Sequence, residues 1–172
     1  IHVSFIKFDL SNSLEPLLGP RTDLVTASAL FDLVSADWIT QMATAICNRQ
    51  ILFYTVLSYD GQMQWFPPHA MDEAVHKAFD NDQKSDKGLG LACGPDCTDV
   101  LREAFSLQGY QCDNADSPWI INARADNDLL SVLGNGIATA VASRLPSQDM
   151  QDWISALPKK RSVLIGHQDF YA

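Results

Sequence analysis

Positively charged residues are scarce in this sequence of 172 residues. Lys and Arg number 12 against 21 Asp and Glu, which gives a formal net charge of -9 at pH 7 and a pI near 4.6. A chain of this charge repels a phosphate backbone, and its one tight basic cluster, residues 159–161, is too small to reverse that. We therefore expect no nucleic-acid partner.

Long apolar runs and cysteines are also few. The longest strongly apolar run, residues 51–59, is far shorter than the roughly 20 residues of a membrane helix, and the N-terminal segment carries Lys7 and Asp9, unlike a signal peptide. Four cysteines are too few for a disulfide framework. Cys93 and Cys97 lack the second ligand pair of a zinc site, so ordinary thiols are favoured. We expect a cytoplasmic protein with no membrane segment and no metal.

Strand-like and helix-like segments alternate along the chain, which indicates a single α/β domain. Hydrophobic residues make up 47% of the sequence, enough for a core. Apolar runs predict strands at 2–10, 23–28, 50–58, 110–121 and 162–171, and helical spacing predicts helices at 35–49, 70–84, 96–107, 127–145 and 148–157. Ser35 is the expected N-cap of its helix, and Asp60-Gly61 is typical of a turn before an irregular stretch. The order predicts a mostly parallel sheet covered by helices.

The run DLVTASALFDLV, residues 23–34, resembles the fourth conserved block of class I S-adenosylmethionine-dependent methyltransferases. Residues 8–10 resemble the end of that fold's third strand, residues 51–59 its fifth strand, and the last strand its antiparallel closing strand. Residues 85–95 and 115–119 resemble segments of a bacterial subgroup of unassigned substrate. The resemblance implies a Rossmann-like sheet, mostly parallel with an antiparallel C-terminal strand, and S-adenosylmethionine as cofactor.

One element of that family has no counterpart in this sequence: the glycine-rich turn that places backbone N–H groups against the cofactor. We therefore expect residues 1–172 to be the C-terminal part of a single methyltransferase domain whose N-terminal strands are absent from this chain. Residues 60–96 are the expected substrate-covering insertion. The glycines of residues 88–94 are spaced GxGxxxG, but no strand precedes them, so a flexible loop is favoured over a nucleotide-binding turn. Such a fragment alone is expected to be inactive.

The resemblance implies cofactor contacts at the ends of two strands. Asp9 and Leu10 would lie near the adenine or its ribose, and Ala27, Ser28 and Ala29 would lie beneath the methionine part. The alternative for Asp9 is a solvated side chain at a strand end. For Ser28, the contribution would come mostly from its backbone.

The expected acceptor pocket contains candidate catalytic and lining residues. Asp32 would face the pocket, with a local capping role as its alternative, and His69 would serve as a general base, with a surface position at a helix start as its alternative. The expected pocket residues are Tyr59, Trp65, Asp86, Lys87 and Trp119. Aromatic faces suit a cationic methyl donor, although filling gaps in the core is an equal alternative.

Two functional hypotheses follow. The first is methyl transfer from S-adenosylmethionine to a small-molecule acceptor, carried out as part of a longer protein. The second is a catalytically silent, methyltransferase-like interaction module. A nicotinamide-dependent Rossmann enzyme is less supported because its glycine fingerprint is absent. A sheet without its central strands exposes edges that can pair with another copy, so a homodimer is plausible.

Overall fold

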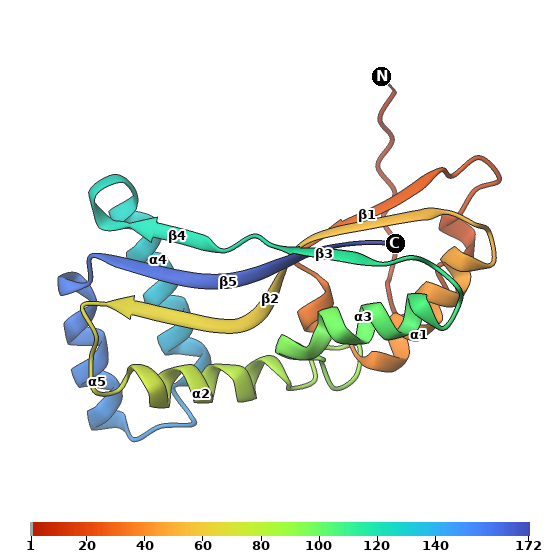
Figure 1. The fold of residues 1–172 in the computed structure, drawn as a ribbon. Coiled ribbons are helices and arrows are strands. Elements are labelled where there is room, and N and C mark those ends of the chain that lie inside the picture. The colour runs from red at the N-terminus through yellow and green to blue at the C-terminus, as the bar shows by residue number, and fades with distance from the viewer. Residues whose placement is uncertain (1) are drawn as a thin grey trace.

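The structure, a computed structural model, describes residues 2–172 and consists of a five-stranded mixed sheet and its helices (Figure 1). The strands are β1 (Leu24–Ser28), β2 (Leu52–Phe66), β3 (Asp113–Asp116), β4 (Trp119–Asn122) and β5 (Ser162–Tyr171). The α-helices are α1 (Ala36–Cys47), α2 (Asp72–Gln83), α3 (Cys97–Ser106), α4 (Ala123–Val141) and α5 (Ser147–Ala156). Short 3-10 helices are η1 (Glu15–Leu17), η2 (Phe31–Leu33), η3 (Gly94–Asp96) and η4 (Leu157–Lys159). Within these residues no helix has the length and apolar character of a membrane span.

The last strand is inserted between earlier strands and runs in the reverse direction. The sheet order is β1-β2-β5-β3, and β4 also pairs with β5. β1 and β2 pair in parallel, whereas β5 is antiparallel to β2, β3 and β4. The other four strands therefore point the same way. The predicted α/β class with an antiparallel last strand is confirmed.

Two hydrophobic cores share the long strand β2. The first joins α1 and α3 to β1 and the beginning of β2, where Phe53 stacks on Phe105 with ring centroids 4.9 Å apart. The second joins α2, α4 and α5 to the end of β2 and the beginning of β5, where Trp65 meets Trp153 edge-on at 5.5 Å. In Figure 1, α1, α2 and α3 lie below the sheet. The junction between the two cores is where a cavity forms.

Helix α1 begins where the sequence predicts. The Ser35 side chain accepts a hydrogen bond of 3.3 Å from the backbone N–H of Trp38, which would otherwise lack a partner in the first turn. One face of the helix then buries Ile39, Met42 and Ile46 in the first core. Capping and an apolar stripe together explain why this segment is helical.

Replacing Ser35 with alanine is expected to lower the free energy of unfolding by about 1 kcal/mol, because the Trp38 N–H loses its partner. Urea unfolding measures this change. Thr40→Ala on the exposed side of the same helix is the matched control and should be nearly neutral. An equal effect of both substitutions would contradict the capping role.

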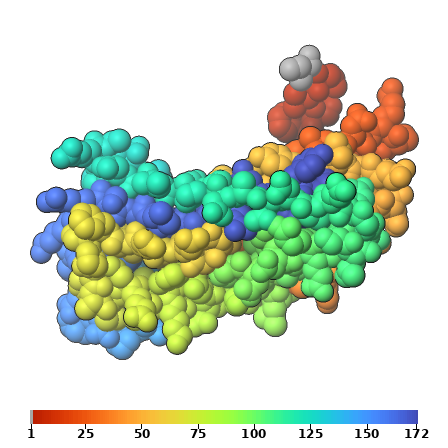
Figure 2. Space-filling model, viewed as in Figure 1, coloured from red at the N-terminus to blue at the C-terminus, as the bar shows by residue number. Residues whose placement is uncertain are grey.

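The predicted strand at residues 2–10 is wrong. No part of residues 2–10 is extended into the sheet, and the Phe5 side chain is 96% exposed. Figure 2 shows the N-terminal residues standing away from the body of the molecule. An extended segment becomes a strand only when a neighbour pairs with its N–H and C=O groups, and none of the described strands lies beside this one.

The predicted turn at Asp60-Gly61 is also wrong. β2 runs through this pair to Phe66, with register shifts against β5 between Thr55 and Ser58 and between Tyr59 and Met63. Gly61 takes a φ of +86°, which a bulged strand accommodates at a glycine. Residues 60–96, the expected insertion, therefore supply the end of β2, all of α2 and η3, and α2 contributes to the second core.

One face of the sheet carries exposed apolar side chains. Leu24, Leu52, Tyr54 and Tyr171 are between 39% and 48% exposed, and they lie in register across β1, β2 and β5. β1 has β2 as its single partner among the described strands. The expected homodimer through such an edge stays a prediction.

Candidate functional site

A cavity of about 150 Å³ lies between the sheet and helices α2 and α4. The sheet and the segment after β1 contribute Asp32, Tyr59, Met63, Trp119, Ile165 and His167, and the two helices contribute Phe79, Gln83, Leu133 and Ile137. Most of the apolar members belong to the second core. Asp32 belongs to η2, whose neighbouring residues belong to the first core. The cavity is therefore situated where the two cores meet.

The chain reversal after β1 positions Asp32. Ala29, with a φ of 50°, donates its backbone N–H to the Val56 carbonyl oxygen, and η2 follows directly. The Asp32 side chain is 8% exposed, and its Oδ1 has no hydrogen-bond partner among the described residues. Burial raises the pKa of this carboxyl, because removal from water disfavours its charged form.

Two further polar groups of the cavity are unpartnered. Gln83, the last residue of α2, has a buried Oε1 with no partner in the described part of the chain, and the same holds for Nδ1 of His167 on β5. Burial lowers the pKa of His167, so its imidazole is neutral at pH 7. The Trp119 ring lies against it, with centroids 5.0 Å apart. Buried polar atoms are normally paired, so these three atoms are free to form hydrogen bonds with a molecule in the cavity.

Tyr59 forms an aromatic wall. Its hydroxyl donates a hydrogen bond of 2.8 Å to Asp80, and its ring meets Phe79 edge-on at 5.6 Å. Burial raises the pKa of the Tyr59 phenol, and Asp80 raises it further, so the phenol stays protonated. Tyr59 is thus suited to shaping the cavity and not to accepting a proton.

The surroundings of the cavity are acidic. The charges of Asp80, Asp60 and Asp32 all act on Tyr59, and Asp60 and Asp169 act on His167. Among the described residues that line the cavity, none is Lys or Arg. Asp32 is thus the single carboxylate among the described lining residues, with no cation beside it in the lining.

Of the predicted site residues, Asp32, Tyr59 and Trp119 are brought together in this cavity. Sequence reasoning missed Gln83 and His167. His167 lies beside Tyr59 because β2 and β5 pair at this point, between the two register shifts. The pairing of β2 with β5 could have located His167, but the turn expected at residues 60–61 ended β2 too early for that pairing to be predicted.

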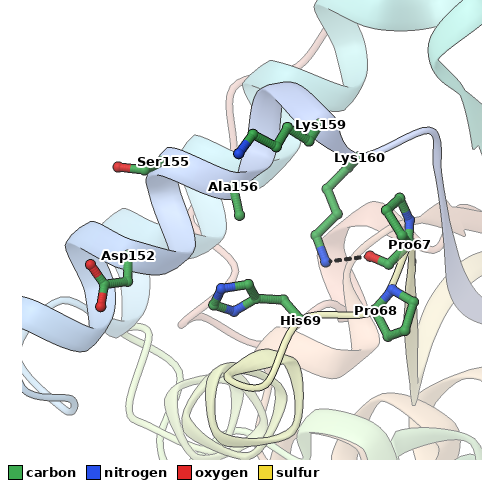
Figure 3. A pocket seen from close by; sticks show the side chains of 8 residues that line it. All are labelled: Pro67, Pro68, His69, Asp152, Ser155, Ala156, Lys159 and Lys160. Carbon is green, nitrogen blue, oxygen red and sulfur yellow. Dashed lines mark hydrogen bonds between the residues drawn. The ribbon is translucent and has the colours of Figure 1, made fainter.

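His69 lies in a different place from Asp32. It lines a hollow of about 290 Å³ between the start of α2 and the end of α5, together with Lys160 (Figure 3). Its Nδ1 accepts a hydrogen bond from the Met71 N–H, and its own N–H donates to Asp72. His69 therefore organises the beginning of α2, and the two residues expected to be catalytic, His69 and Asp32, lie in different hollows.

Trp65, an expected wall of the acceptor pocket, is not part of the cavity. Its side chain is 6% exposed and packs against Trp153 in the second core. Lys160 lies 5.9 Å from its ring centroid. The alternative reading of this residue, a filler of the core, agrees with its position.

The predicted cofactor residues lie at two exposed places. Asp9 and Leu10 line an open hollow with Lys87, and Asp9 is bonded to the Ser11 N–H and hydroxyl, which lower the pKa of its carboxyl. Asp86 accepts a hydrogen bond from the Gly88 N–H, which organises the glycine loop. The second place is the end of β1, where Ala27 packs against the first core and Ser28 and Ala29 are exposed.

Lys87 also forms an ion pair of 2.7 Å with Asp82, which Arg144 shares. Within residues 2–172, no cluster of His, Cys, Asp or Glu could hold a metal ion. Burial raises the pKa of the Cys97 thiol to about 12, so this cysteine stays protonated.

No protein-family model matches the chain, and no curated protein matches it either.

Proposed function

We propose that this chain supplies the acceptor-binding part of an enzyme that transfers a methyl group from S-adenosylmethionine to a small molecule. The observation that carries the proposal is the order of the sheet, β1-β2-β5-β3/β4, with the last strand inserted and reversed. The reversed direction of the last strand agrees with the antiparallel closing strand that the resemblance implies. In such sheets, ligands bind beyond the carboxyl ends of the parallel strands.

The cavity supports an acceptor site in this proposal. Asp32 follows β1 directly, and it is joined there by Gln83 and His167, each with an unpartnered buried atom. A carboxyl of raised pKa is a stronger base than an ordinary one, so Asp32 is the residue suited to accept a proton from the acceptor. The apolar and aromatic walls exclude water from that proton transfer.

The residues of this chain do not by themselves enclose the cofactor. The hollow beside Asp9 and Leu10 is open, and Ser28 and Ala29 are exposed at the end of β1. The glycine loop reaches the hollow beside Asp9 through Gly88 and Leu89, but the Gly88 N–H is already bonded to the Asp86 carboxylate. Cofactor binding therefore requires residues in addition to those described, and we assign this chain only the acceptor side.

The alternative function is a silent interaction module. The open hollow at Asp9 and the exposed apolar sheet face of Leu24, Leu52, Tyr54 and Tyr171 favour it. In that case the exposed face binds a protein partner or a second copy, and the cavity has no methyl acceptor.

Calorimetric titration of the intact gene product with S-adenosylmethionine tests the proposal. We expect saturable, equimolar binding, and we expect Asp9→Asn to weaken it by about tenfold through the lost carboxylate hydrogen bonds. Asp128→Asn, at an exposed position on α4, is the matched control and should bind as the parent does. A flat titration of the folded parent protein would contradict methyl transfer and favour the silent module.

A further inference from the structure

The unpartnered atoms of the cavity specify the kind of group that it binds. Oε1 of Gln83 accepts hydrogen bonds and cannot donate them, and Oδ1 of Asp32 does the same when it is ionised. His167, being neutral, can also present an acceptor. A ligand that pairs with these atoms must therefore carry N–H or O–H donors.

Because the free atoms of Asp32 and His167 are buried, a ligand that bonds to them gains affinity. Asp32 and His167 are each 8% exposed, so neither can satisfy its free atom fully with bulk water. An unpaired buried acceptor carries a desolvation cost that a bound donor removes. The same atoms would reject a ligand that offers only acceptors, since two facing acceptors leave both unpaired.

The charges around the cavity favour a positively charged ligand. Asp32 lines the cavity, while Asp80 and Asp60 act on its Tyr59 wall, and no Lys or Arg of the described chain lines it. The rings of Tyr59, Phe79 and Trp119 add three aromatic walls. Aromatic faces attract cations, and a carboxylate pairs with one through charge-assisted hydrogen bonds.

The size of the cavity limits the ligand to a small molecule. About 150 Å³ is comparable to a cavity that accommodates benzene, a single six-membered ring. Trp119 is 40% exposed, so the wall that it forms lies next to solvent and leaves a route for entry. A nucleotide or a peptide would not fit inside.

We infer that this cavity binds a small organic amine in its protonated form, with the ammonium N–H groups donating to Asp32 and Gln83 and the carbon skeleton against Tyr59, Phe79 and Trp119. The inference rests on the proposed function only in naming this amine as the methyl acceptor, which would give one N–H proton to the Asp32 carboxylate so that its lone pair can take the methyl group. As a statement about binding, it concerns the chain's own residues.

Three probes of one shape and different charge test the inference: benzylamine, benzyl alcohol and benzoate. Each is titrated into the folded chain without cofactor, and binding is followed by the amide spectra of residues around the cavity. Benzylamine is expected to bind at least about tenfold more tightly than benzyl alcohol, and benzoate is expected not to bind. Equal binding of all three, tighter binding of benzoate, or no binding of benzylamine would overturn the inference.

Two variants test whether Asp32 causes the preference for benzylamine. Asp32→Asn should weaken benzylamine binding by about tenfold to a hundredfold and leave benzyl alcohol nearly unchanged, because the variant removes the charge and keeps the shape. Asp128→Asn removes a charge elsewhere on the surface and should change neither. A loss of benzylamine binding equal in both variants would assign the effect to net charge, and the inference would fail.

The test of amine binding and the test of methyl transfer can fail independently. If benzylamine binds through Asp32 while the intact gene product does not bind S-adenosylmethionine, the amine site stands and methyl transfer fails. If S-adenosylmethionine binds while benzylamine does not, the acceptor belongs to another chemical class and methyl transfer stands.

Discussion

Replacing Asp72 with alanine is expected to lower the free energy of unfolding by about 3–5 kcal/mol. Lys160 is 4% exposed, and its Nζ donates to both carboxylate oxygens of Asp72, at 3.0 and 2.9 Å, and to the Pro67 carbonyl oxygen. The Asp72 carboxylate also accepts hydrogen bonds from the Trp153 indole and the His69 N–H. The substitution leaves a buried ammonium without its counter-charge, and an uncompensated buried charge is strongly destabilising.

Urea unfolding of Asp72→Ala measures this loss. Asp72→Asn keeps an acceptor at the same place and should lose less stability than the alanine variant. Asp128→Ala, on the exposed side of α4, is the control and should change stability little. A loss below about 1 kcal/mol for Asp72→Ala would mean that the pair with Lys160 is solvated and not buried.

Replacing Asp32 with asparagine is expected to raise the free energy of unfolding near pH 7, because asparagine keeps the shape of the side chain and cannot carry the buried negative charge. Burial raises the pKa of Asp32 in the folded protein, so the folded state retains this proton to a higher pH than the unfolded state. Between the two pKa values, the unfolded chain binds fewer protons, and stability falls as pH rises. Above the folded pKa, the loss from Asp32 is complete and constant.

The difference in unfolding free energy between Asp32→Asn and the parent should therefore be small at acid pH and grow as pH rises from the ordinary carboxyl range through the raised pKa. Chemical unfolding at a series of pH values measures it, with Asp128→Asn as the control whose difference stays flat. A parent protein that is more stable than Asp32→Asn at neutral pH would show that the carboxylate has a partner in the free protein.

Local signals in the sequence predicted most helices and strands. They failed where pairing with a segment far away in the sequence determines the structure. The Ser35 cap and the apolar stripe of α1 are local, and the helix forms as expected. Residues 2–10 have the composition of a strand but no neighbour to pair with, so propensity alone does not make them one. Asp60-Gly61 has the composition of a turn, but the partner β5 holds it within a bulged strand.

The candidate site was predictable only in part, for the same reason. Asp32, Tyr59 and Trp119 follow from the rule that ligands bind beyond strand ends, and all three line the cavity. Gln83 lies at the end of a helix and His167 within the last strand, and both enter the cavity through contacts far apart in sequence. His69 has the chemistry of a base, but its hydrogen bonds with Met71 and Asp72 assign it to the start of a helix.

The amide spectrum of the isotope-labelled intact gene product, titrated with S-adenosylmethionine, tests the central claim most directly. We expect saturable shifts at Asp9 and Leu10 and at Ser28 and Ala29, the two exposed places assigned to the cofactor, with none around Lys160. Shifts confined to the hollow of His69 and Lys160, or a spectrum that does not change, would contradict the assignment of methyl transfer to this fold.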